Sequence, residues 1–337
     1  MREYELEVLE QYHIEVKGTR KIRGAFFIDT NEGTMLLKET GLSDRRAPLL
    51  YIILSHLESV GFGPVDTPVF TAEGKLVGTS REGKRYLLKK WYSGRECDVR
   101  REGDVLETAG NLARLHQKLC WQPVCGIEEK EELKPQKGRN LQDEFDCHNR
   151  ELKKIRAFVR GRSSKDRFDY LFLSHFEPMY RQAAQVTDRL RESGYEGLYR
   201  ESMEGSRLIH GDYNYHNVLM LPAAEVATTN FEHFRMDIPV QDLCYFLRKV
   251  MEKHHWDAAL GDAMLNSYGK ICPLRQAELE YMALKLAYPE KFWKTMNSYY
   301  HSNKVWVPEK NVEKLMVSVT QSDEKMNFLE KIFSFHL

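Results

Sequence analysis

A change of hydrophobic period near residue 93 restricts the possible folds of this chain more than any other feature. Before it, short apolar runs end at turn signals, as is typical of strands; these runs are residues 14–16, 25–28, 34–38, 69–71, 76–78 and 85–88. After Gly94, nearly every segment has the period of a helix. We therefore expect an α+β chain with a small β-rich domain over residues 1–93 and a large, mostly helical domain over residues 94–337.

Two helices are predicted around this junction. Residues 48–60 have apolar side chains at helical spacing, and the glycines and proline that follow should end the helix. A second helix should begin near Asp104, which can form a capping box with Glu107 ahead of an apolar stripe. Because ligand sites often lie where two lobes meet, we expect the functional residues near this boundary.

The most specific motif lies in the segment of residues 208–221. It contains His210-Gly211-Asp212, with Asn217 five residues after the aspartate, and apolar residues on both sides predict two flanking strands. This is the catalytic-loop spacing of kinase-like phosphotransferases. Asp212 would accept the proton of an attacking hydroxyl, and Asn217 would hold a metal ion through its amide oxygen. His210 completes the catalytic-loop set, and we expect it to pack under the loop and support its backbone.

Three further residues fit such a site. Phosphoryl transfer needs a fixed positive charge for the nucleotide phosphates, and Lys38, at the end of an apolar strand, is the candidate. The alternative for Lys38 is a hydrated lysine at a strand end. Gly24 lies in a turn that can cover phosphates with backbone N–H groups, although the chain has no G-x-G-x-x-G pattern. Asp242 opens an apolar helix and is expected to cap it and to brace the catalytic loop.

Two positions depart from an ordinary site of this kind. Asn230 stands where an aspartate would be the main magnesium ligand, and a neutral amide holds this hard cation less well than a carboxylate does. Glu232 and Asp237 are the acids considered as replacements. The helix of residues 48–60 offers only Glu58, near its end, to hold a phosphate-binding lysine in place.

Composition argues against several classes of function. Lysine plus arginine and aspartate plus glutamate number 50 each, so no net field favours nucleic acid or a membrane surface. No apolar run approaches the ~18 residues of a spanning helix, and the N-terminal residues resemble no signal region, so we expect synthesis and residence inside a cell. The six cysteines lack C-x-x-C spacing and are expected to be reduced thiols. Metal binding by Cys120 with Cys125, or by Cys147 with His148, is the less favoured interpretation.

A run of basic residues lies between positions 153 and 167, opposed only by Asp166. A docking strip for an acidic partner and a hydrated helix face both fit this run, and we favour the second.

These residues resemble the aminoglycoside-phosphotransferase and choline-kinase branch of the protein-kinase-like superfamily. Within it, the chain most resembles the spore-coat CotS family of endospore-forming bacteria. The resemblance spans nearly the whole chain and is carried by Lys38, by residues 109–116, 210–217 and 229–232, by Asp242-Leu243 and by the tail of residues 288–293.

The resemblance implies a two-lobed kinase-like fold and a site for ATP with Mg²⁺. Asp212 would be the base and Lys38 the phosphate-binding lysine. The metal ligands would be Asn217 and Asn230. The adenine would contact the hinge that runs from Leu88 to Trp91.

Two functions compete. The first is an ATP-dependent phosphotransferase acting on a hydroxyl of a small molecule, a sugar or a coat protein, as Asp212 and Asn217 suggest. The second is a pseudokinase-like component of the spore coat without turnover, as Asn230 suggests. We favour a kinase-fold spore-coat protein with weak or absent turnover. The expected partners are a nucleotide and an unknown acceptor, or other spore-coat proteins, but neither nucleic acid nor a membrane. We expect synthesis in the cytoplasm and a final location in the spore coat.

Overall fold

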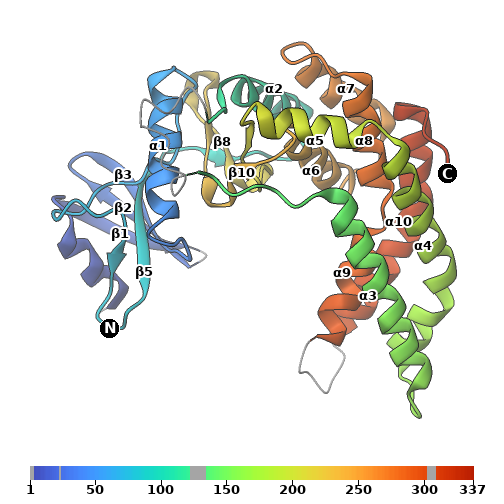
Figure 1. Ribbon diagram of the computed structural model, residues 1–337. Helices are drawn as coiled ribbons and strands as arrows, with labels where there is room; N and C mark the ends of the chain where they lie inside the picture. Colours follow the sequence, from blue (N-terminus) through green and yellow to red (C-terminus); the bar gives the residue numbers. More distant parts are fainter. Residues whose placement is uncertain (1–3, 23, 122–133, 302–308) are drawn as a thin grey trace. The chain divides into compact units, whose positions relative to one another are not determined.

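The structure is a computed structural model that describes residues 4–22, 24–121, 134–301 and 309–337 (Figure 1). The chain forms two compact units. The first unit comprises residues 1–137, 203–245 and 270–272. The second comprises residues 138–202, 246–269 and 273–337. None of the described helices has a stretch long and apolar enough to cross a membrane.

The first unit begins with a short 3₁₀ helix, η1 (Tyr4–Gln11), and an antiparallel sheet. Within the described residues this sheet has five strands in the order β1-β2-β3-β5-β4 (Figure 1). The strands are β1 (Val16–Ile22), β2 (Ala25–Thr30), β3 (Gly33–Glu39), β4 (Gly78–Thr79) and β5 (Arg85–Lys90). The first three strands pair in chain order, whereas β5 pairs with β3 across the intervening α1 and β4.

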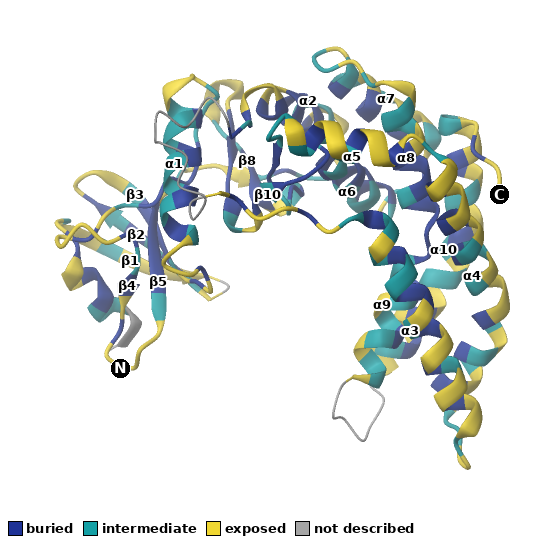
Figure 2. Cartoon of the chain, viewed as in Figure 1, coloured by how far each residue is buried: buried dark blue, intermediate teal, exposed yellow. Residues whose placement is uncertain are grey.

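One face of this sheet holds a hydrophobic core. Phe26, Leu37 and Leu88 are buried there together with residues of η1 (Figure 2). Because neighbouring residues of a strand point to opposite faces, Lys38 and Lys89 point away from that core. Strand alternation therefore places both lysines on the same side of the sheet.

Helix α1 (Arg46–Ser59) follows β3 and buries Leu50, Ile53 and Leu57 at helical spacing. It ends before Gly61, whose φ of 67° is a conformation that favours glycine. The predicted helix of residues 48–60 is thus present, with its start two residues earlier.

The remainder of the first unit carries the catalytic-type loop. Helix α2 (Glu102–Lys118) is followed later in the chain by β7 (Leu208–Ile209), β8 (Val218–Met220), β9 (Val226–Thr228) and β10 (Arg235–Met236). Strand β7 pairs with β10, whereas β8 lies between β6 (Arg95–Glu96) and β9. The loop of residues 210–217 therefore connects strands of two different small sheets.

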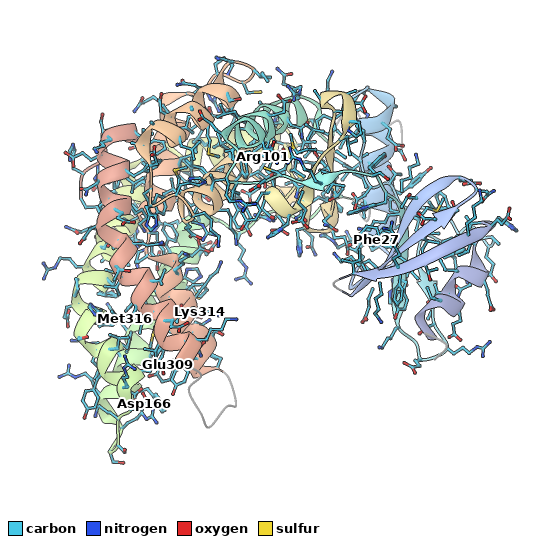
Figure 3. The ribbon with its side chains drawn as sticks, turned by 180° about the vertical axis from the view of Figure 1, so that it is seen from behind. Phe27, Arg101, Asp166, Glu309, Lys314 and Met316 are labelled. Carbon is cyan, nitrogen blue, oxygen red and sulfur yellow. The ribbon has the colours of Figure 1, made fainter. Side chains whose placement is uncertain are left out.

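The second unit is helical. Its elements are α3 (Leu141–Gly161), α4 (Arg167–Glu192), α5 (Tyr195–Glu204), α7 (Ala258–Gly269), α8 (Gln276–Ala287), α9 (Glu290–Tyr300) and α10 (Glu309–Phe333), and α6 (Val240–Met251) runs into it from the first unit. A core of Phe168, Phe172 and Phe176 from α4 packs with Leu152 of α3 and Phe292 of α9. Figure 3 labels Asp166, which caps the start of α4, and Glu309, the first residue of α10.

The predicted architecture, an antiparallel sheet followed by a mostly helical region, is confirmed. Three local predictions were wrong, one of them the strand at residues 76–78, of which only Gly78 belongs to β4. Residues 69–71 form no strand, because Thr71 N–H instead bonds the Lys75 carbonyl in a turn. Asp104 does not cap α2, which begins at Glu102. Its carboxylate instead accepts hydrogen bonds from the Arg95 guanidinium at 2.8 Å and from the Asp98 N–H at 3.0 Å.

The compact units divide the chain differently from the predicted domains, because the loop of residues 210–217 groups with the N-terminal sheet. The boundary at residue 93 stays a prediction.

Part of the basic run of residues 153–167 is used inside the second unit. Arg156 pairs with Glu177, and Arg162 pairs with Asp169. Lys153 lies over the ring of Tyr180, 5.2 Å from its centroid. These contacts fit a packing surface better than a docking strip.

Candidate active site

The loop of residues 210–217 is held by Asp242, a buried residue in the first turn of α6. One carboxylate oxygen accepts the His210 N–H at 2.7 Å and the other accepts the Gly211 N–H at 3.0 Å. Burial alone would raise the pKa of Asp242, but hydrogen bonds and the neighbouring His116 and His210 lower it. The predicted brace is thus in place, although Asp242 lies inside the helix rather than at its cap.

His210 supports the loop from below and is fully buried. Its Nε2 donates to the Thr229 carbonyl at 2.9 Å, and its Nδ1 accepts the Asp212 N–H at 3.2 Å. These two contacts select the neutral tautomer with hydrogen on Nε2, and burial lowers the pKa of the ring. Both nitrogens are occupied, so His210 positions the backbone of Asp212 and is not placed to transfer a proton.

Four side chains from distant parts of the sequence form a continuous chain of hydrogen bonds. Lys38 Nζ donates to Asn230 Oδ1 at 3.2 Å, and Asn230 Nδ2 donates to Asn217 Oδ1 at 2.8 Å. Asn217 Nδ2 then donates to Asp212 Oδ2 at 3.0 Å. The structure therefore brings together the candidate base, both candidate metal ligands and the candidate phosphate-binding lysine.

A second cluster lies beside the first and was not predicted from the sequence. Lys89 is fully buried and pairs with Asp66 at 3.2 Å and with Glu232 at 2.8 Å. Asp66 also accepts the Asn230 N–H at 2.8 Å, and Thr40 donates its hydroxyl to Glu232 at 2.8 Å. The two clusters thus share a backbone contact at Asn230.

In this second cluster, one lysine lies between two acidic side chains. Burial alone would raise the pKa of Glu232, but Lys89 and, more weakly, Thr40 and Lys38 lower it. Burial alone would lower the pKa of Lys89, but Asp66 and Glu232 raise it. Lys89 and Glu232 are therefore held in their charged forms.

Neither acid considered as a replacement for the missing aspartate is available in this arrangement. Both carboxylate oxygens of Glu232 are occupied by Lys89 and Thr40. Asp237 accepts from the Arg235 guanidinium at 3.0 Å and from the Ile238 N–H at 2.9 Å. Glu58 pairs with Lys90 and not with Lys38.

The hinge and turn candidates do not join the cluster. Leu88 is buried in the core of the sheet, and its carbonyl accepts the Val69 N–H at 2.8 Å. Trp91 packs edge-on against Phe27 and lines a cavity of about 400 Å³, but the described lining residues do not include Lys38. Gly24 lies in the β1–β2 turn with a φ of 82°.

The donor set does not fit magnesium in this arrangement. The amide hydrogen of Asn230 points at the amide oxygen of Asn217, and the remaining oxygen of Asn230 is bonded to Lys38. Magnesium prefers carboxylate, phosphate and water oxygens, and neither asparagine carries a charge. Among the described residues, no group of three or more histidine, cysteine, aspartate or glutamate side chains is arranged to hold a metal.

The five described cysteines are free thiols, and Cys125 lies outside the described residues.

Lys89 could have been found from the sequence. It continues the apolar strand of residues 85–88, and its alternation with Leu88 predicts the same face as Lys38. The partner Asp66 lies in a loop without periodicity, so its contact with Lys89 depends on tertiary structure.

Comparison of the sequence with known proteins identifies a family model and a curated relative. The family model described as "Spore coat putative kinase YutH" matches residues 213–332. Spore coat protein S of Bacillus subtilis (strain 168) is 25% identical over 344 residues, which cover 97% of this chain and 93% of that protein.

Comparison with solved structures shows the fold. An aminoglycoside phosphotransferase from Alicyclobacillus acidocaldarius has a TM-score of 0.83 at 18% identity, covering 97% of this chain and 95% of that one. A spectinomycin phosphotransferase bound to AMP has a TM-score of 0.61 at 13% identity, covering 98% of both chains. The amicoumacin kinase hAmiN, in complex with AMP-PNP and Ca²⁺, has a TM-score of 0.60 at 14% identity, covering 94% of this chain and 92% of its own.

The resemblance expected from the motifs is confirmed on both levels, since the sequence matches a spore coat protein over nearly its full length and the fold matches phosphotransferases. The chain is thus similar to a CotS-type spore coat protein and has the kinase-like fold of the aminoglycoside phosphotransferases.

Proposed function

We propose that this chain is a spore-coat protein that keeps the nucleotide-binding part of a kinase site and transfers phosphate weakly or not at all. The hydrogen-bond chain from Lys38 through Asn230 and Asn217 to Asp212 carries the proposal. At its ends lie a cation for phosphates and a carboxylate for an acceptor hydroxyl. Between them lie two neutral amides, where phosphoryl transfer needs a strong metal site.

The position of Lys38 supports nucleotide binding. Its hydrogen bond is to a neutral amide oxygen, and it makes no ion pair with a described residue. A phosphate oxygen can replace that amide, because a charge-assisted hydrogen bond is stronger than one to a neutral acceptor. Glu232, the nearby acid, is already neutralised by Lys89.

Weak turnover follows from Asn230. The transferred phosphoryl group needs its developing charge neutralised, and a metal ion normally supplies most of that stabilisation. Asn217 and Asn230 are neutral and are hydrogen-bonded to each other, so they are poor ligands for such an ion.

One observation favours an active phosphotransferase as the second candidate. The partly exposed carboxylate of Asp212 accepts amide hydrogens from Asn214 at 3.1 Å and from Asn217 at 3.0 Å, which fixes its orientation. A base held in this way can accept the proton of an acceptor hydroxyl while the hydroxyl oxygen bonds to the γ-phosphorus and the bond to ADP breaks.

A thermal-shift titration with ATP, performed without metal and with Mg²⁺ or Mn²⁺, separates these candidates. We expect ATP to raise the melting temperature without metal, with little further gain from either cation, because occupancy stabilises the folded state. Lys38→Met should remove the response, and Lys84→Met, which alters an exposed lysine of the same unit, should keep it.

Two results would change the conclusion. A large metal-dependent shift with ADP release that Asp212→Ala abolishes would favour the active enzyme. A melting temperature that does not respond to ATP under any condition would contradict nucleotide binding.

Location in the coat is tested separately. The proposal rests on the similarity to spore coat protein S. In sporulating cells that carry the gene, an antibody should detect the chain in the detergent-extracted coat fraction of purified spores. Detection only in the soluble lysate would contradict a coat role.

A further inference from the structure

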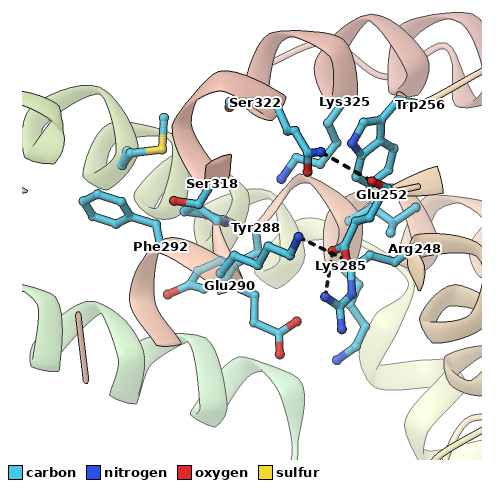
Figure 4. Close-up of a pocket in the computed structure, with 15 residues that line it drawn as sticks. Arg248, Glu252, Trp256, Lys285, Tyr288, Glu290, Phe292, Ser318, Ser322 and Lys325 are labelled. Atoms are coloured by element: carbon cyan, nitrogen blue, oxygen red, sulfur yellow. Dashed lines mark hydrogen bonds and ion pairs between the residues drawn. The ribbon is translucent and has the colours of Figure 1, made fainter. Parts of the chain in front are cut away.

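The second unit contains a small polar cavity lined from α6, α8, α9 and α10, with Met179 of α4 (Figure 4). Its volume is about 40 Å³. That volume exceeds the need of a single water molecule but is far too small for a nucleotide. A ligand of this cavity must therefore be a small ion or molecule.

The lining has more positive than negative charge. Its charged side chains are Arg248, Lys285, Lys291, Lys325, Glu252 and Glu290. Glu252 is shared by Arg248 and Lys291, each at 3.0 Å, and Glu290 pairs with Lys294, which does not line the cavity. Neither Lys285 nor Lys325 is within ion-pair or hydrogen-bond distance of a described residue, although Lys285 is close enough to Glu290 to help lower the pKa of that carboxyl.

The pKa of Lys325 reflects the burial and the positive charge around it. Lys325 extends from α10 among the other lining side chains (Figure 4) and is partly buried. Burial, together with the nearby charge of Arg248, lowers the pKa of its ammonium group to about 8. Glu252 and Glu290 act in the opposite direction on this pKa, so the ammonium group stays mostly charged at neutral pH, and a bound anion would stabilise that charge further.

A neutral donor at the cavity wall also lacks an acceptor. Trp256 is 5% exposed, and its indole Nε1 has no hydrogen-bond partner among the described residues. Water could accept such a hydrogen bond, but it would leave the excess positive charge of the cavity unchanged. An oxyanion would accept this hydrogen bond and would also offset the excess positive charge.

We propose that this cavity binds one small oxyanion of the size and charge of inorganic phosphate. Lys285 and Lys325 supply the charge, and charge-assisted hydrogen bonds to an oxyanion are strong. The small volume favours the free ion over a phosphate group attached to a larger molecule. The site is built within the second unit and does not depend on the nucleotide site.

The test is calorimetric titration of the full chain with sodium phosphate, with sodium chloride at matched ionic strength as the reference. We expect one saturable phosphate site per chain and none for chloride. A parallel titration with glycerol 3-phosphate tests a larger phosphate ester, which should bind more weakly than inorganic phosphate.

Variants locate the site. Lys325→Met should weaken phosphate binding roughly tenfold or more, because it removes a charged hydrogen bond. It should fold at least as well as the unaltered chain, since it removes an unpaired ammonium group from a partly buried position. Lys285→Met should also weaken binding. Lys314→Met, an exposed position on the same helix (Figure 3), should leave binding unchanged.

A second measurement does not depend on any variant. An NMR titration of the Lys325 amino group in the unaltered chain should show its pKa rise when phosphate is added, because the anion offsets Arg248, Lys285 and Lys291. An unchanged Lys325 pKa in saturating phosphate, or equal phosphate binding by Lys325→Met and the unaltered chain, would overturn the proposal.

Discussion

At the scale of single residues, Asn230 decides how this site treats a metal ion. Replacing it by aspartate should place a carboxylate between Lys38 and Asn217 and strengthen magnesium-dependent ATP binding, since magnesium favours charged oxygen ligands. The backbone should tolerate the change, because aspartate, like asparagine, is enriched at a positive φ such as the 63° found here. The measurement is the increase in the ATP-induced thermal shift on adding Mg²⁺.

Asn31→Asp is the control for this prediction, because it adds the same charge in an exposed turn of the same unit. It should leave the metal effect unchanged. If Asn230→Asp also hydrolyses ATP, the further change Asp212→Ala should stop the reaction. An equal metal effect in the unaltered chain and in Asn230→Asp would show that Asn230 does not limit the site.

Replacing Lys89 should lower the free energy of unfolding substantially. Lys89→Met would leave the buried Asp66 and the partly buried Glu232 without their cation, and breaking a buried ion pair in this way costs about 3–5 kcal/mol. Lys90→Met removes the adjacent lysine, which pairs with Glu58 at the surface, and should cost less than about 1 kcal/mol. Urea denaturation at neutral pH measures both changes.

The pH dependence of the Lys89→Met defect follows from Glu232. In the unaltered chain the pKa of Glu232 is lowered, so its pairing stabilises the fold above the unfolded glutamate pKa of about 4.3 and is lost as the pH falls through the folded value. Without Lys89, burial should raise that pKa, and the variant's deficit should shrink as the pH is lowered from 7.5 to 5. A deficit that grows toward pH 5 would show that Glu232 is not the destabilised group.

At the scale of elements, the loop between β7 and β8 depends on the close approach of Gly211 to the neighbouring backbone. Its φ is 83°, and a Cβ at this position would lie 2.1 Å from the His233 carbonyl oxygen. Gly211→Ala should therefore cost more than about 4 kcal/mol or prevent folding. Gly24→Ala is the matched control, because its φ is 82° and no atom lies within 4 Å of the added Cβ.

The control should cost only about 1–2 kcal/mol, the strain of a left-handed conformation alone. Thermal or urea denaturation compares the two variants. Equal losses would show that the contact with His233 does not hold the loop.

Much of this loop could be predicted, because the residues that define it are contiguous in the sequence. The motif around Asp212 and the apolar residues on each side place a loop between two strands, and both strands are present. The pairing of Lys38 with Asn230 could not be predicted, since 192 positions separate them and their contact depends on tertiary packing. Local spacing also failed at Asp104, where the tertiary partner Arg95 takes the carboxylate that a capping box would use.

At the scale of the whole molecule, the two proposed ligand sites belong to different compact units. The cluster of Lys38 and Asp212 lies in the first unit, and the cavity of Lys325 lies in the second. The family match of residues 213–332 includes every lining residue of the cavity except Met179, and it does not include Lys38. Sequence patterns predicted the first site because its motif is contiguous, whereas the cavity combines single residues from separate helices.

Hydrogen exchange read by mass spectrometry should therefore separate the two ligands. ATP should slow exchange in peptides from β3 and the loop of residues 210–217, because bound ligand suppresses the local opening that exchange requires. Phosphate should instead slow exchange in α10 around Lys325 and in α6 around Arg248.

Lys325→Met should lose only the phosphate effect and Lys38→Met only the ATP effect. If ATP protects α10 in the unaltered chain but not in Lys325→Met, the cavity would be a subsite for nucleotide phosphates, and the two sites would not be independent.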